Sequence, residues 1–200
     1  EAARQQWRDT RAPWELSEGF LFGPVDTEGL DPSLDSWPVN RTDLDAVLAS
    51  SSDLTPATVA GLEATLRGFH TIEYLLFGED GTKQAADFTD REVQYLVSAT
   101  AVLRDDAGTL ATLWNPTGGG YALQIANAGT SGSIYVSQNA AVQELVGGLV
   151  TITDEVGAGK LGGPFGDRST AEEESPRPRR ATASPHHARA SPGAASAQAP

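Results

Sequence analysis

Apolar residues recur at helical spacing in three long stretches of the chain, 55–77, 89–114 and 142–156, and the alternation typical of a strand is nearly absent. Their apolar positions fall three or four residues apart, as one buried face of a helix requires. Shorter helical pieces are predicted at 1–11, 43–51 and 121–128. The pattern therefore predicts an all-α fold whose long helices pack as an antiparallel bundle.

Local signals fix where the long helices begin and end. Thr55-Pro56 is typical of an N-cap followed by proline at the first helical position. Thr89 and Glu92 form a capping box. Gly78 and Asn115-Pro116 are stop signals for the first and second helix. The first stretch is thus predicted to be one helix, from Thr55-Pro56 to Gly78.

The composition changes near residue 168. From Ser169 to Pro200 the chain has no Leu, Ile, Val, Phe, Tyr or Trp, and Ala, Pro, Ser and Arg dominate. Such a segment cannot bury enough apolar surface to offset its ordering entropy. We therefore expect a helical domain at 1–166 and a disordered tail at 167–200, which contains the His186–His187 pair.

Charge and composition exclude several classes of protein. The net charge is −13, and so acidic a surface repels phosphate backbones and attracts cations; we expect no nucleic-acid partner. Without cysteine the chain has no disulfides, thiolate zinc sites or cysteine nucleophiles. It begins with Glu1 and contains no methionine, so we expect a processed product or a fragment, with any signal segment outside it.

Candidate chemistry is concentrated in residues 61–78. His70 is the only histidine of the predicted helical domain, and Glu73 follows one helical turn later, so both side chains could reach one ion. Glu73 takes a place where the apolar stripe predicts a hydrophobe, so a buried carboxylate there needs a partner. Glu63, two turns before His70, shares nearly the same face of the predicted helix.

Two interpretations of this His–Glu pair remain open. It is either a metal-binding pair, as in the Glu/His pairs of di-metal bundles, or a structural hydrogen bond within a core. Thr71 follows His70, so the HExxH arrangement of zinc peptidases is missing. No GxSxG turn exists for serine catalysis.

Four motifs, in order, resemble the imelysin-like family. GFHTIEYLLFG (68–78) contains the GxHxxE signature of that family through Gly68, His70 and Glu73. The others are RAPWELSEGFLFGPV (11–25), LDSWPV (34–39) and GKLGGPFG (159–166). The resemblance implies an extracytoplasmic all-helical protein of two bundle-like halves, exported or lipid-anchored in bacteria, at the periplasm or outer membrane. The family was first described as an insulin-cleaving metallopeptidase, and related proteins are linked to iron uptake.

The resemblance also implies site residues. His70 and Glu73 are the signature pair, and Glu18 and Asp35 lie inside matched motifs as further candidate metal ligands. Glu18 could equally be a solvated charge at a helix end, and Asp35 a cap. The family continues after 166 into a second helical half, which here is replaced by the tail. We therefore expect this chain to supply only one wall of any site between the halves. We also expect exposed apolar surface, with marginal stability or self-association as its consequence. Phe20, Phe22 and Trp37 are expected in the core.

Three function classes follow. The favoured one is a protein that binds iron or another divalent metal, such as zinc, outside the cytoplasm and passes it to membrane-associated uptake machinery. The acidic surface and oxygen-rich ligands with one imidazole suit these ions. The second is a metal-dependent peptidase, which needs an open coordination position, an activated water and a base. The third is a helical interaction module with a structural His70–Glu73 pair.

Overall fold

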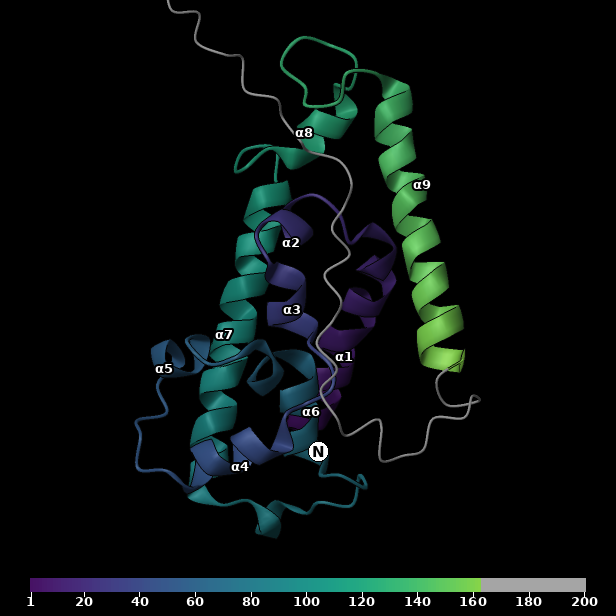
Figure 1. Cartoon of the computed structure of the whole chain (residues 1–200). Helices are drawn as coiled ribbons and strands as arrows, with labels where there is room; N and C mark the ends of the chain where they lie inside the picture. The colour runs from purple at the N-terminus through teal and green to yellow at the C-terminus, as the bar shows by residue number, and fades with distance from the viewer. Residues whose placement is uncertain (163–200) are drawn as a thin grey trace, which may run out of the picture.

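The computed structural model describes residues 1–162, which form helices and no strand. The all-α prediction is therefore confirmed, and Figure 1 shows the arrangement. The helical segments in chain order are α1 (Ala2–Ser17), η1 (Glu18–Phe20), α2 (Pro24–Thr27), α3 (Leu30–Asp35), α4 (Arg41–Ala49), α5 (Pro56–Ala60), η2 (Ala64–Leu66), α6 (Gly68–Phe77), η3 (Ala85–Asp87), α7 (Asp90–Trp114), α8 (Tyr121–Ala126), α9 (Gln138–Asp154) and η4 (Glu155–Leu161).

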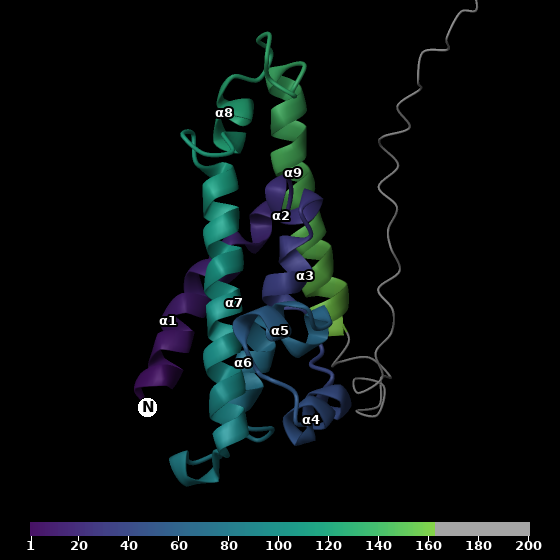
Figure 2. The same ribbon diagram turned by 90° about the vertical axis from the view of Figure 1, so that its left-hand side faces the viewer.

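The core forms around α7, the longest described helix, which packs against α3, α5 and α6 (Figures 1 and 2). Its most buried side chains are Leu34, Leu44, Leu54, Val59, Ile72, Leu75 and Tyr95. Tyr95 lies inside this core and its hydroxyl donates to the carbonyl of Leu66 at 2.5 Å. Burial raises the pKa of Tyr95 to about 12, so this hydroxyl stays a donor.

The predicted boundaries of α7 are confirmed. Thr89 accepts a hydrogen bond from the backbone of Glu92, whose side chain accepts from the backbone of Thr89 in return. The helix ends at Trp114, with Asn115 in an extended conformation before Pro116. Thr55 likewise caps its helix.

The single helix predicted over 55–77 is wrong, because the segment contains three helical pieces. α5 ends at Ala60, η2 is one short turn, and Arg67 is extended with φ −144°. Apolar spacing continues across these breaks because each piece turns its apolar side to the same core. Spacing alone therefore does not reveal a break of this kind.

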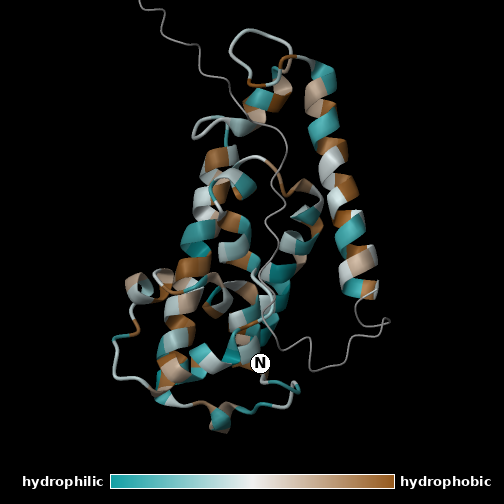
Figure 3. Ribbon diagram, in the orientation of Figure 1, coloured by the Kyte–Doolittle hydropathy of each residue, from teal (hydrophilic) through white to brown (hydrophobic). Residues whose placement is uncertain are grey.

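α9 lies on the opposite side of α1 and α3 from α7, as Figure 1 shows, and it contacts the rest of the bundle mainly at η1. It ends at Asp154 and continues as the π-helical turn η4. Figure 3 shows apolar residues along its length. Several large ones are exposed, namely Val142, Val146, Leu149 and Val150. This outer apolar face agrees with the expectation of exposed apolar surface.

The whole predicted tail, 167–200, including His186–His187, lies outside the described residues. Within residues 1–162, none of the helices combines the length and apolar character needed to cross a bilayer.

Candidate functional site

His70, on α6, lies between two carboxylates. Its Nε2 is 3.2 Å from Oδ1 of Asp35, and its Nδ1 is 3.2 Å from Oε2 of Glu73. An imidazole whose two nitrogens both face acceptors is favoured in its protonated form, which has two N–H donors. Burial by itself lowers the pKa of His70, but the hydrogen bonds to the two carboxylates outweigh burial, and the pKa is raised.

Asp35, the last residue of α3, lies at the centre of the cluster, with 10% of its side chain exposed. Besides facing His70, it pairs with the guanidinium of Arg11, and its Oδ2 accepts from the indole nitrogen of Trp14 at 2.7 Å. Burial by itself raises the pKa of Asp35, but the three donors outweigh it and hold the pKa far below its ordinary value. Asp35 is therefore an anion at neutral pH.

Arg11 links Asp35 to two further carboxylates. Its Nε donates to Oε1 of Glu15 at 2.5 Å, and its NH2 group lies 3.7 Å from Glu18. Glu18 is itself buried and accepts from Nζ of Lys160, in η4, at 2.8 Å. The result is one alternating network of charges, hereafter the His70 network, from η4 to α6.

The glycine of the GxHxxE signature positions His70. Gly68 begins α6 with φ +82°, a conformation that favours glycine. A Cβ at this position would lie 2.4 Å from the carbonyl oxygen of Leu34, so only glycine lets the start of α6 approach the backbone of α3. Because Asp35 follows Leu34, this close approach brings His70 to Asp35.

Trp37 forms the solvent side of the site. Its ring packs edge-on against His70 with 4.8 Å between centroids, and 63% of the residue is exposed. The expectation that Trp37 and Phe20 belong to the core is wrong, since Phe20 is 48% exposed. Phe22, at 6% exposure, is in the core as expected. Trp37 lies in the connection between α3 and α4.

Of the residues predicted from the sequence, Asp35, His70 and Glu73 come together, whereas Glu18 is reached only through Arg11. The expectation that Glu73 is a buried carboxylate is wrong, because its side chain is 40% exposed. Phe69 and Leu76, the stripe positions on either side of it, are buried, and Glu73 lies at the edge of that buried face.

The expected position of Glu63 beside His70 is also wrong. Glu63 is exposed and precedes η2, and an extended residue separates η2 from α6. Sequence reasoning missed two functional candidates, Arg11 and Trp14, although both lie in the matched segment 11–25. Their spacing of three residues on α1, which puts both on one face, was the available signal.

The described residues offer few ligands for a tightly bound metal ion. Asp35 and Glu73 lie at opposite nitrogens of one imidazole. Within residues 1–162, no three His, Asp or Glu side chains are grouped so that they could hold a metal ion. The described part of the chain thus offers one or two ligands at either nitrogen, and further ligands would have to come from water or from another part of the protein.

The helical fold and the Gly68–His70–Glu73 arrangement define the class: an all-helical protein with a GxHxxE site. The chain belongs to the Imelysin family (Peptidase_M75), whose model matches residues 1–187. The match extends past Gly166, where the sequence resemblance was expected to end. The recognition of the imelysin-like family is therefore confirmed.

Two relatives make the comparison concrete. The chain is 38% identical over 167 residues to "Iron-regulated protein A" of Synechococcus elongatus, covering 82% of this chain and 43% of that protein. It is 30% identical, with a TM-score of 0.68, to the crystal structure of a protein described as an iron-regulated protein A precursor from Parabacteroides distasonis, covering 79% of this chain and 47% of that one. The chain thus spans less than half the length of either relative.

Proposed function

We propose that this chain binds a metal cation at His70 as part of an extracytoplasmic protein of iron acquisition. Family membership and two relatives named as iron-regulated support an iron-related role. The cation is cargo, delivered to membrane-associated uptake machinery. Iron is the favoured cargo and zinc the comparison ion, because imidazole and carboxylate groups suit both.

One observation carries the proposal: the His70 network has more carboxylates than cations. Its charged members, apart from His70, are Glu15, Glu18, Asp35, Glu73, Arg11 and Lys160. Four carboxylates against two cationic side chains leave two excess negative charges when His70 is neutral. A divalent cation cancels this excess, whereas an anionic ligand would add to it.

The cation binds on the Glu73 side of the imidazole. Asp35 already accepts hydrogen bonds from Arg11 and Trp14, so an ion at Nε2 would have to displace a donor. Glu73, in contrast, is 40% exposed and pairs only with Nδ1 of His70 among the interactions described for it. Water, or the second helical half of the longer relatives, completes the coordination.

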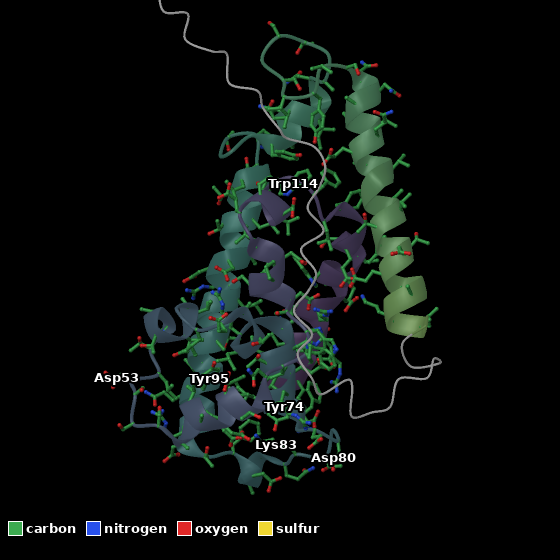
Figure 4. The ribbon with its side chains drawn as sticks, viewed as in Figure 1. Asp53, Tyr74, Asp80, Lys83, Tyr95 and Trp114 are labelled. Atoms are coloured by element: carbon green, nitrogen blue, oxygen red, sulfur yellow. The ribbon has the colours of Figure 1, made fainter. Side chains whose placement is uncertain are left out.

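Calorimetric titration of Fe²⁺ (without oxygen) and Zn²⁺ into the full chain tests this. His70→Ala and Glu73→Gln are each expected to lower affinity by about tenfold or more, because each removes a direct ligand. Asp53→Asn is the matched control, since this exposed carboxylate lies between α4 and α5, away from the network (Figure 4). Affinity should also fall as the pH drops below the raised pKa of His70, since a ligating imidazole must be neutral.

The metal isotherms separate this proposal from a purely structural His–Glu pair, and melts measured in parallel report how far each variant is destabilised. If the pair is structural, His70→Ala lowers the melting temperature while the metal isotherms stay the same in all variants. Identical isotherms in the wild type, His70→Ala and Glu73→Gln therefore overturn the metal-binding proposal.

The family's peptidase designation supplies a second candidate function. Hydrolysis needs a metal with an open coordination position, a metal-activated water and a positioned base. We expect binding without turnover, because His70 and Glu73 alone leave no further residue for the base. Metal-dependent cleavage of a peptide that is abolished by both His70→Ala and Glu73→Gln would instead establish the peptidase.

A further inference from the structure

An apolar cavity lies at the junction of α1, η1, α2, α7, α8 and α9. It adjoins the His70 network at Trp14, whose indole nitrogen donates to Asp35. Its volume is about 380 Å³. Trp14, Phe20, Val25, Trp114 and, from α9, Leu145 are among the residues that line it, and the cavity is partly open to solvent. Figure 4 labels Trp114 at the end of α7, next to α2 and α8.

The polar groups near this cavity are already engaged. The hydroxyl of Ser17, which also lines it, donates to the carbonyl of Trp14 at 2.7 Å. The indole nitrogen of Trp14 donates away from the cavity, to Asp35. An ordered water needs two to four polar partners, and this lining offers few, so water fills the space poorly.

One wall of the cavity is held rigidly from behind. Trp114 packs edge-on against Phe22 at 5.9 Å and against Tyr121 at 5.0 Å between ring centroids. The hydroxyls of Tyr121 and Tyr135 are 2.6 Å apart, which fixes the Tyr121 ring. Gly23, with φ +66°, leaves room for that ring, since a Cβ there would lie 2.3 Å from it. The Trp114 face is therefore pre-formed.

Size and lining indicate the class of ligand. Small-molecule sites have volumes of about 300–1,000 Å³, and an apolar cavity of about 150 Å³ already holds benzene. A cavity of about 380 Å³ therefore accommodates a larger molecule, such as one with two fused rings. Two tryptophans favour edge-to-face contacts with an aromatic ligand. No cationic side chain of residues 1–162 lines the cavity, so an anionic ligand has no partner there.

We propose that this cavity is a binding site for a neutral aromatic molecule of about two fused rings. The site is formed by α1, η1, α2, α7, α8 and α9, and it is independent of the cation proposed at His70. Leu145 is the lining residue that α9 contributes, and α9 contacts the bundle mainly at η1.

The test is a calorimetric titration of 2-naphthol into the full chain at neutral pH, with tryptophan fluorescence as a second readout. We expect saturable binding of one molecule per chain. Leu145→Trp fills the cavity and is expected to weaken binding by about tenfold or more. Leu110→Phe, a smaller change in the lining, supplies the same test if Leu145→Trp does not fold.

The control is Val150→Ser, on the outer apolar face of α9, where an apolar probe could also adsorb. This change is expected to leave the affinity for 2-naphthol unchanged. Loss of binding in Val150→Ser but not in the cavity variants would place the probe on the outer face and overturn the proposal. Absence of saturable binding to the wild type would overturn it as well.

Discussion

Replacing Asp35 with asparagine tests whether the His70 network is an integrated part of the fold. Asp35 is the anion that compensates the buried guanidinium of Arg11, and it also accepts from Trp14 and His70. Asparagine has the shape of aspartate but no charge. Its NH₂ group is a donor, and at this position it faces other donors. The change therefore leaves buried donors unpaired.

The magnitude follows from burial. Removing one partner of a buried ion pair costs about 3 to 5 kcal/mol. Arg11 keeps Glu15 at 2.5 Å and Glu18 at 3.7 Å, so the lower end of that range, about 3 kcal/mol, applies. For a folded unit of this size, that cost lowers the melting temperature by about 6 to 12 °C.

The assay is urea unfolding at neutral pH, followed by far-ultraviolet circular dichroism. Asp53→Asn again serves as the control, because it removes an exposed charge of the same kind. A free energy of unfolding for Asp35→Asn within about 0.5 kcal/mol of that for Asp53→Asn would refute the reasoning, since such values are typical of surface substitutions.

Three more outcomes are expected. Because the pKa of His70 is raised, the contribution of His70 to stability is complete below the ordinary pKa of histidine and is lost as the pH rises through the raised value. The difference in unfolding free energy between wild type and His70→Ala should therefore shrink between about pH 5 and about pH 8. Gly68→Ala should cost about 1 to 3 kcal/mol or more in the same urea assay, because φ is +82° and the Leu34 carbonyl is too close; an unchanged midpoint would contradict this. The full chain should self-associate in sedimentation velocity through the outer face of α9, and Val150→Ser should reduce the association; a monomer at all concentrations would refute it.

How well the sequence predicted the helices depended on how local their signals are. The start of α7 was predictable because Thr89 and Glu92 satisfy each other's backbone within one turn. The breaks between α5 and α6 were not, since they depend on the carbonyl of Leu34 meeting Gly68 across 34 residues of sequence. A positive φ that a tertiary contact requires is marked in the sequence only by a glycine. Many glycines have other roles, so a glycine alone does not predict such a contact.

The same division applies to the site. His70 and Glu73 were found from helical spacing because they lie on one helix, one turn apart. The family resemblance alone points to Asp35, and Arg11 is absent from the predicted site. Both reach His70 through long-range packing: Arg11 is 24 residues from Asp35 in the sequence. Periodicity describes one helix at a time and gives no information on which helices meet.

The partial exposure of the Glu73 side chain has a physical reason that bears on its role. Its position falls on the apolar stripe between Phe69 and Leu76, and both of these are buried. Glu73 lies at the edge of this buried face, beside His70, with 40% of its side chain exposed. A carboxylate fixed in the core would be engaged in an internal ion pair, as Asp35 is with Arg11. The close approach at Gly68 brings His70 to Asp35, and the place of Glu73 at the edge of the buried face leaves it accessible. The proposed binding of a cation requires this combination.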